Sequence, residues 1–126
     1  MQKKILLIDN DPDILAVMQE ALDYEGFEVF TASKTEDIVS LVCNIKPDLL
    51  LIDYILDGIN GGELCHQLKA DHKTAALPVI IISAYPRVLK SLGYYGCDAF
   101  IPKPFDLYDL IDQINSYSCI STKYYN

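Results

Sequence analysis

Short apolar runs alternate with longer segments of helical periodicity along almost the entire chain. Runs of this length, bounded by turn-forming residues, are typical of buried parallel strands. Parallel strands require long, right-handed crossover connections, so the alternation predicts five βα units. We therefore expect an α/β fold with a doubly wound, five-stranded parallel sheet and helices on both faces. The predicted strands cover residues 5–8, 27–31, 49–52, 79–82 and 99–101.

Capping residues mark the ends of several predicted helices. Asp11 precedes Pro12 in the pattern of an N-cap followed by proline at the first helical position. Gly26 is expected to end this first helix. Ser33 and Glu36 have capping-box spacing ahead of a second helix. Further helices are predicted over residues 63–69, within 85–95, and over 107–114 after a cap at 106, whereas 116–126 has no clear pattern.

Two of the predicted strands end in an acid. Asp9 follows the first apolar run, and Asp53 closes the most apolar stretch in the first half of the chain. In an open parallel α/β sheet, ligand chemistry collects beyond the carboxyl ends of the strands. Two acids at that edge can hold a hard cation, or one of them can act as a nucleophile.

The composition is that of a single acidic domain. The chain has 126 residues, of which 51% are hydrophobic, and a formal net charge of −8. This charge argues against direct binding to nucleic acid, which needs clustered Lys and Arg. The four cysteines are widely spaced without a C-x-x-C pair, so we expect reduced, buried thiols in a cytoplasmic protein. No signal peptide or membrane-spanning run is visible.

Five motifs together resemble the receiver domain of bacterial two-component response regulators. Each motif is weak alone, but they occur in order, at strand ends, and cover nearly the whole chain. The resemblance implies one domain over residues 1–126 with the flavodoxin-like strand order 2-1-3-4-5. The motifs are Ile5–Asp11, Leu50–Asp53, the loop Gly58–Gly61, Ile81–Ala84, and the aromatic-x-x-Lys-Pro-Phe signature Phe100–Phe105.

The resemblance implies phosphoacceptor chemistry at Asp53. Its carboxylate would attack a phosphoryl group and form an acyl phosphate. The family uses Mg²⁺ as cofactor, and its ligands map to Asp9, Asn10, Asp53 and the backbone carbonyl of Ile55. Positive charge is needed on the oxygens of the transferred group, and the bound cation supplies part of it.

Three further residues would respond to the phosphoryl group. Lys103, before a cis bond to Pro104, would place its ammonium against the phosphoryl oxygens. Ser83 would donate its hydroxyl to them. Phe100 would change between outward and inward rotamers, although simple core packing is an equally plain interpretation of this residue.

The chain departs from the family pattern at several positions. Asn10 stands where an acid is usual, so we expect weaker Mg²⁺ binding. Asp57 stands where proline is frequent, and the segment 83–103 is about two residues shorter than usual. Ile55 and Tyr85 occupy positions that influence phosphate lifetime in the family. Because neither activates water well, we expect slow self-dephosphorylation.

The predicted function is that of a phosphorylation-controlled signalling domain, not an enzyme beyond its own phosphorylation and dephosphorylation. A sensor histidine kinase or a histidine phosphotransfer protein would donate the phosphoryl group. A downstream protein, or a missing C-terminal output domain, would receive the signal through the face formed by the fourth helix, fifth strand and fifth helix. A group of tyrosines fits either a docking or homodimer surface or simple coverage of the core edge: Tyr94, Tyr95, Tyr108 and Tyr117.

Three other functions are alternatives to this prediction. Asn10 motivates a degenerate receiver that works as an unphosphorylated interaction module. A hydrolase is disfavoured because Ile55 stands where aspartyl-phosphate phosphatases often carry a general acid. A flavin-binding protein would need a glycine- and hydroxyl-rich loop after the first strand, where this chain has Asn10, Asp11 and Pro12.

Overall fold

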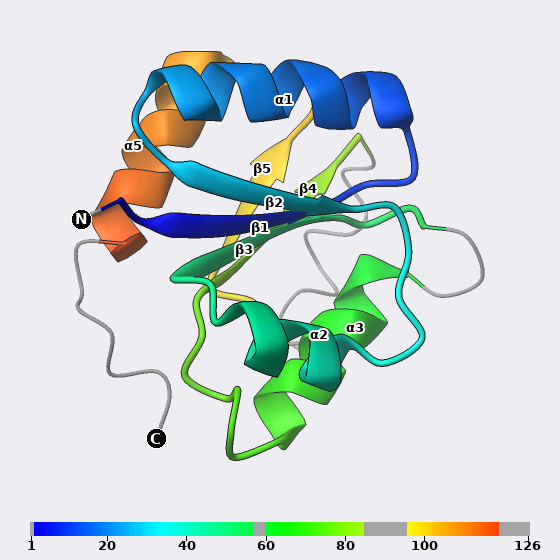
Figure 1. Ribbon diagram of the computed structural model, residues 1–126. Coiled ribbons are helices and arrows are strands. Elements are labelled where there is room, and N and C mark those ends of the chain that lie inside the picture. Colours follow the sequence, from blue (N-terminus) through cyan, green and yellow to red (C-terminus); the bar gives the residue numbers. More distant parts are fainter. Residues whose placement is uncertain (1, 57–59, 85–95, 119–126) are drawn as a thin grey trace.

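The fold is a parallel sheet between two helical layers, in a computed structural model that describes residues 2–56, 60–84 and 96–118 (Figure 1). The strands are β1 (Lys4–Ile8), β2 (Glu28–Ala32), β3 (Leu49–Asp53), β4 (Val79–Ser83) and β5 (Ala99–Pro102). The helices are α1 (Pro12–Tyr24), α2 (Ile38–Ile45), α3 (Gly61–Ala70) and α5 (Leu107–Ser118). The helix expected within 85–95, with Tyr85, Tyr94 and Tyr95, lies outside the described residues, as does Asp57.

The sheet has the predicted topology. All neighbouring strands pair in parallel, in the order β2-β1-β3-β4-β5. Figure 1 shows α1 and α5 on one face and α2 and α3 on the other. The doubly wound, flavodoxin-like fold is therefore confirmed, and each strand lies within one residue of its predicted bounds.

The central strands explain the continuous apolar runs. Every residue of β3 and β4 is buried. Alternate side chains reach opposite faces of the sheet: in β1, Leu7 packs in the cluster that includes α1 and α5, and Leu6 in the cluster that includes α2 and α3. Because helices cover both faces, both alternating sets must be apolar. Among the described residues, no helix is long and apolar enough to cross a membrane.

The N-terminal cap of α1 is as predicted, but that of α2 is not. The side chain of Asp11 accepts a hydrogen bond from the backbone N–H of Asp13 at 2.9 Å. The capping box predicted at Ser33 is wrong, because Asp37 caps α2. Its carboxylate accepts the Ser40 backbone N–H at 3.1 Å and the Ser40 hydroxyl at 2.8 Å. An anionic acceptor next to the helix N-terminus is favoured over the neutral hydroxyl of an earlier residue.

Two other helices are longer than predicted. Asn60 caps α3 by accepting the Glu63 N–H at 2.8 Å, so this helix begins at Gly61 and not at residue 63. At the other end of the chain, α5 continues to Ser118, beyond the periodic residues 107–114 and into 116–126, where the end of the last helix and a tail were expected. The predicted cap of α5 is present, since Asp106 accepts the backbone N–H of Tyr108 at 2.7 Å.

Candidate functional site

The carboxyl edge of the sheet brings together one lysine and two acids. Asp9 follows β1, Asp53 ends β3, and Lys103 follows β5. The ammonium of Lys103 lies 3.1 Å from Asp53 Oδ1 and 3.6 Å from Asp9 Oδ2. Asp9 and Asp53 are only 3% and 6% exposed, so the pair is held in a region of low dielectric. The structure thus juxtaposes three of the residues that the sequence selected.

Asp9 is fixed in place through both carboxylate oxygens. While Oδ2 faces Lys103, Oδ1 accepts a hydrogen bond from the backbone N–H of Asp11 at 2.9 Å. The side chain of Asp11 is occupied at the N-terminus of α1, as described above. Asp11 therefore supports the site through its backbone, and its carboxylate serves the helix.

The environment of Asp53 works against its charged form. Burial raises the pKa of this carboxyl, and the nearby charge of Asp9 raises it further. Lys103 and the backbone N–H of Ile55 have the opposite effect on the pKa, but the balance lies above the ordinary value. The negative charge of Asp53 is thus a cost to the folded state, which a cation bound at this edge would reduce.

Ser83 and Phe100 lie on the neighbouring strands β4 and β5, and of the two Ser83 contacts the cluster. Ser83 ends β4 and is 1% exposed, and its backbone carbonyl accepts the Lys103 N–H at 2.8 Å. The Lys103–Pro104 peptide bond is cis, as the resemblance implied. Phe100 is half-buried in β5 and packs against the cluster on the α2 and α3 side.

Gly61 is a site residue that the sequence did not single out for this role. Its N–H donates to the Tyr54 carbonyl at 2.8 Å, directly after β3. A Cβ atom on Gly61 would lie 2.3 Å from the backbone oxygen of Asp53. Only glycine therefore allows α3 to begin this close to the end of β3. The signal in the sequence was the Gly61-Gly62 pair, which looked like part of a loop.

The donor atoms at this edge are suited to a hard divalent cation. They are the buried carboxylates of Asp9 and Asp53, with the amide of exposed Asn10 and the carbonyl of Ile55 next to them in the chain. Mg²⁺ prefers such oxygens and needs one or two carboxylates besides waters. Two carboxylates facing one ammonium also leave an excess of negative charge. Among the described residues, no three acidic, histidine or cysteine side chains gather as a complete metal site.

An apolar groove opens beside Lys103. It has a volume of about 660 Å³ and is lined by one face of α1, by Ala84, and by the residues that follow β5. Val17 on α1 is 67% exposed and Leu107 is 39% exposed, and both line this groove as parts of one apolar patch. A second groove, of about 540 Å³, lies along β5 and α5 and is lined in part by Asp109 and Asp112.

The two tyrosines of α5 differ in whether they cover the core edge or remain available as a docking surface. Tyr108 is 76% exposed. Tyr117 packs against the α1 and α5 core, and its hydroxyl donates to the Asp98 carbonyl at 2.9 Å. Tyr117 therefore covers the core edge, whereas Tyr108 is available on the surface.

Comparisons with known proteins identify the family of this chain. The model of the response regulator receiver domain family matches residues 5–115. The chain therefore belongs to this family, whose members are modules of two-component signalling and not classical enzymes.

Individual relatives support the assignment. The chain is 31% identical over 116 residues to the phosphate regulon transcriptional regulatory protein PhoB of Pseudomonas aeruginosa, over 90% of this chain and 51% of PhoB. It is 28% identical to the DNA-binding dual master transcriptional regulator RpaA of Synechocystis sp., over 90% of this chain and 48% of RpaA. The chain thus spans about half the length of these curated relatives.

A solved structure is similar over nearly the whole domain. The response regulator TrrA of Thermotoga maritima, crystallised in complex with Mg²⁺-BeF, has a TM-score of 0.83 and 26% identity, over 92% of this chain and 99% of that one. A putative response regulator from Chloroflexus aurantiacus has a TM-score of 0.87 at 22% identity, over 94% of this chain and 99% of that chain, which supports the fold.

Proposed function

We propose that this chain is a phosphoacceptor receiver of a two-component phosphorelay, with Asp53 as the residue that is phosphorylated. The observation that carries the proposal is the buried Asp53 carboxylate, 3.1 Å from Lys103 Nζ and beside the second buried acid, Asp9. The receiver would comprise residues 1–126, with 116–126 forming the end of the last helix and a tail.

The proposed chemistry follows from the positions of these groups. An oxygen of Asp53 attacks the phosphorus of a phosphohistidine, a P–O bond forms, and the P–N bond breaks with its electron pair returning to the ring nitrogen. The imidazole leaves as a neutral ring that keeps the proton already on its other nitrogen. Lys103 offsets the charge on the phosphoryl oxygens as they arrive next to it. Ser83, at the end of the adjacent strand, supplies a hydroxyl. Asp9, Asn10, Asp53 and the Ile55 carbonyl would hold Mg²⁺, which contributes further positive charge when bound.

The phosphodonor would be a histidine kinase or a histidine phosphotransfer protein. The apolar groove beside Lys103 supports a protein donor, because it offers a docking surface directly next to the acceptor site. A helix laid against α1 over Val17 and Leu107 would bring a histidine on that helix towards Asp53. The free thiols of Cys43, Cys65 and Cys97 are consistent with a cytoplasmic location.

The phosphorylated state would be recognised by a downstream protein or domain at the surface next to β5. The charge of the new phosphoryl group draws Ser83 and Lys103 towards it and shifts the equilibrium of Phe100 and the adjoining surface. The reader is a separate protein or a C-terminal output domain; the curated relatives, which are named as transcriptional regulators, are about twice as long as this chain. Exposed Tyr108 on α5 is available for such a contact or for a homodimer.

A degenerate receiver that acts without phosphorylation is the second candidate. Asn10 favours it, since one of the expected acids is absent from the metal edge. The retention of Asp9, Asp53, Ser83 and Lys103 in one cluster favours the phosphoacceptor instead. An interaction module has no chemical need for this combination.

Intact-protein mass spectrometry after incubation with acetyl phosphate and Mg²⁺ tests the proposal. We expect one added phosphoryl group on the parent chain and none on Asp53→Asn. The adduct should persist well beyond seconds in the purified protein, in keeping with slow self-dephosphorylation. Absence of any adduct at high Mg²⁺ with rapid quenching would refute the phosphoacceptor role and favour the interaction module.

A further inference from the structure

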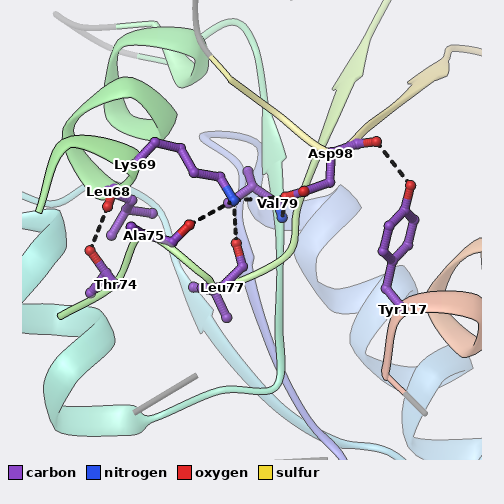
Figure 2. A network of polar contacts seen from close by, with 8 residues as sticks. All are labelled: Leu68, Lys69, Thr74, Ala75, Leu77, Val79, Asp98 and Tyr117. Carbon is purple, nitrogen blue, oxygen red and sulfur yellow. Dashed lines mark hydrogen bonds and ion pairs between the residues drawn. The ribbon is translucent and has the colours of Figure 1, made fainter. Parts of the chain in front are cut away.

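A second lysine–acid cluster lies at the opposite end of the sheet, where β4 and β5 begin (Figure 2). Lys69, in the last turn of α3, points its ammonium towards Asp98, directly before β5. The distance from Lys69 Nζ to Asp98 Oδ2 is 2.8 Å. The same ammonium donates to the backbone carbonyls of Leu77 at 2.7 Å and Ala75 at 3.3 Å. All three N–H donors of Lys69 thus have acceptors.

Asp98 joins three other elements through different atoms. Its Oδ2 accepts the Val79 N–H at 2.8 Å in addition to Lys69, and its own N–H donates to the Val79 carbonyl at 2.9 Å. Its carbonyl accepts the Tyr117 hydroxyl at 2.9 Å. Asp98 is therefore bonded at once to α3, to the start of β4 and to the end of α5, and we call this set of contacts the Asp98 clamp (Figure 2).

The strand that follows the clamp has fewer anchors than the central strands, which are paired on both sides. β5 has four residues, lies at an edge of the sheet and pairs with β4 alone. Its last residue, Pro102, has no N–H to donate. The flanking bonds are those of Asp98 to Val79 at one end and of Lys103 to Ser83 at the other. A shift by one residue would turn every side chain of the strand to the opposite face.

We propose that Lys69 and Asp98 are positioning residues for phosphorylation: the clamp fixes the register of β5 and thereby holds Lys103 against Asp53. The inference rests on the proposed function. Lys103 lies five positions after Asp98, so the clamp acts on the site from about 16 Å away along the strand. On its N-terminal side, Lys103 is connected to the rest of the domain only through β5.

The pair is suited to this role because its loss should not unfold the domain. The side chains of Lys69 and Asp98 are 19% and 34% exposed, so water can solvate Asp98 when Lys69 is removed. The two large hydrophobic clusters contain neither residue. Loss of the clamp should therefore loosen β5 selectively and leave β1 and β3, which carry Asp9 and Asp53, in place.

Two measurements on Lys69→Met test the proposal, with Lys73→Met as the matched control. Lys73 is an exposed lysine four residues away that takes no part in the clamp. In the unphosphorylated protein, amide hydrogen exchange should accelerate about tenfold in residues 99–103 and stay unchanged in β1 and β3. The rate of phosphorylation by acetyl phosphate should fall about tenfold, as expected when a catalytic group is slightly misplaced.

Mg²⁺ affinity separates positioning from general loosening. The predicted metal ligands come from the ends of β1 and β3, so the Mg²⁺ dissociation constant of Lys69→Met should equal that of the parent. Asp98→Asn, which keeps an acceptor for Val79, should show the same three results. Unchanged exchange in β5, or a parallel loss of Mg²⁺ affinity, would overturn the proposal. A parent chain that accepts no phosphoryl group would refute the proposed function itself, together with any role of the clamp in it.

Discussion

Two half-buried lysines, Lys69 and Lys103, lie at opposite ends of the sheet and differ in how their charge is balanced. Lys69 is saturated by one carboxylate and two carbonyls at 2.7, 2.8 and 3.3 Å. Lys103 faces two carboxylates at the longer distances of 3.1 and 3.6 Å. These contacts hold the Lys69 side chain in one position, as expected of a residue with a structural role. Lys103 lies in an environment with excess negative charge and room to rearrange, which suits a group that must meet an incoming anion.

Substitution of the two lysines by the same residue should separate these roles most strongly. Lys103→Met removes the cation that contacts the phosphoryl oxygens, so its phosphorylation rate should fall on the order of 10²-fold or more. The loss in Lys69→Met should be about tenfold, because that residue acts only through β5. Acetyl phosphate kinetics followed by intact mass provide the measurement. Equal losses in the two variants would mean that Lys69 and Lys103 contribute to phosphorylation in the same way.

Two glycines provide a similar comparison for stability. Gly61→Ala places a methyl group against the backbone of Asp53, which cannot move aside, and should cost about 3 kcal/mol of unfolding free energy. Gly96→Ala, next to the clamp, should cost about 1 kcal/mol, from its φ of +75°. There the nearest atom is the flexible stem of Lys69, at 3.4 Å. Urea unfolding of both variants measures the difference, and a reversed order would contradict it.

A third substitution sharpens the electrostatic contrast by adding charge to the site. Asn10→Asp restores the acid that the family usually has, so Mg²⁺ should bind about tenfold more tightly, as judged from a typical effect of one nearby charge. Titration of the parent and variant with Mg²⁺ provides the test. Identical affinities would mean that residue 10 does not take part in metal binding.

The smallest effect concerns the pH dependence of stability. Because the pKa of Asp53 is raised in the folded state, its contribution to stability is fully present below the unfolded pKa of about 4 and is lost as pH rises through the folded pKa. Asp53→Asn should therefore raise the urea midpoint at neutral pH, and the gain should vanish towards pH 4. Asp98→Asn should lower the midpoint at neutral pH, because it removes an ion pair. A destabilised Asp53→Asn at neutral pH would show that Lys103 outweighs burial.

The sequence predicted those features that arise from local pattern. Continuous apolar runs required burial on both faces, so the strands and their parallel arrangement could be inferred. Asp9 and Asp53 were selected because they follow strands whose carboxyl ends share one edge, whereas Lys103 was selected only through the resemblance to the receiver family. The cap at Asp11 was predicted correctly because this acid stands directly before Pro12. At α2, several polar residues compete for the N-terminus, and spacing alone chose Ser33 over Asp37.

The remaining features depend on tertiary contacts that no local pattern encodes. The need for glycine at residue 61 arises from its approach to the backbone of Asp53, eight residues earlier in the chain. The clamp joins Lys69 to Asp98, which are 29 residues apart. In the sequence, Lys69 looks like an ordinary basic residue in the last turn of a helix, and Asp98 looks like part of a turn. Their relationship becomes visible only when the sheet order places α3 beside the start of β5.

Pro102 in β5 also bears on the solubility of the domain. An exposed edge strand offers unpaired backbone groups to which another chain can add, and this is a common route to aggregation. β5 limits that risk because it is only four residues long and its last residue lacks an N–H. The same shortness that makes the strand dependent on an external anchor thus makes it a poor template for intermolecular sheet growth. Lengthening β5 to strengthen the site would be expected to increase the tendency to self-associate.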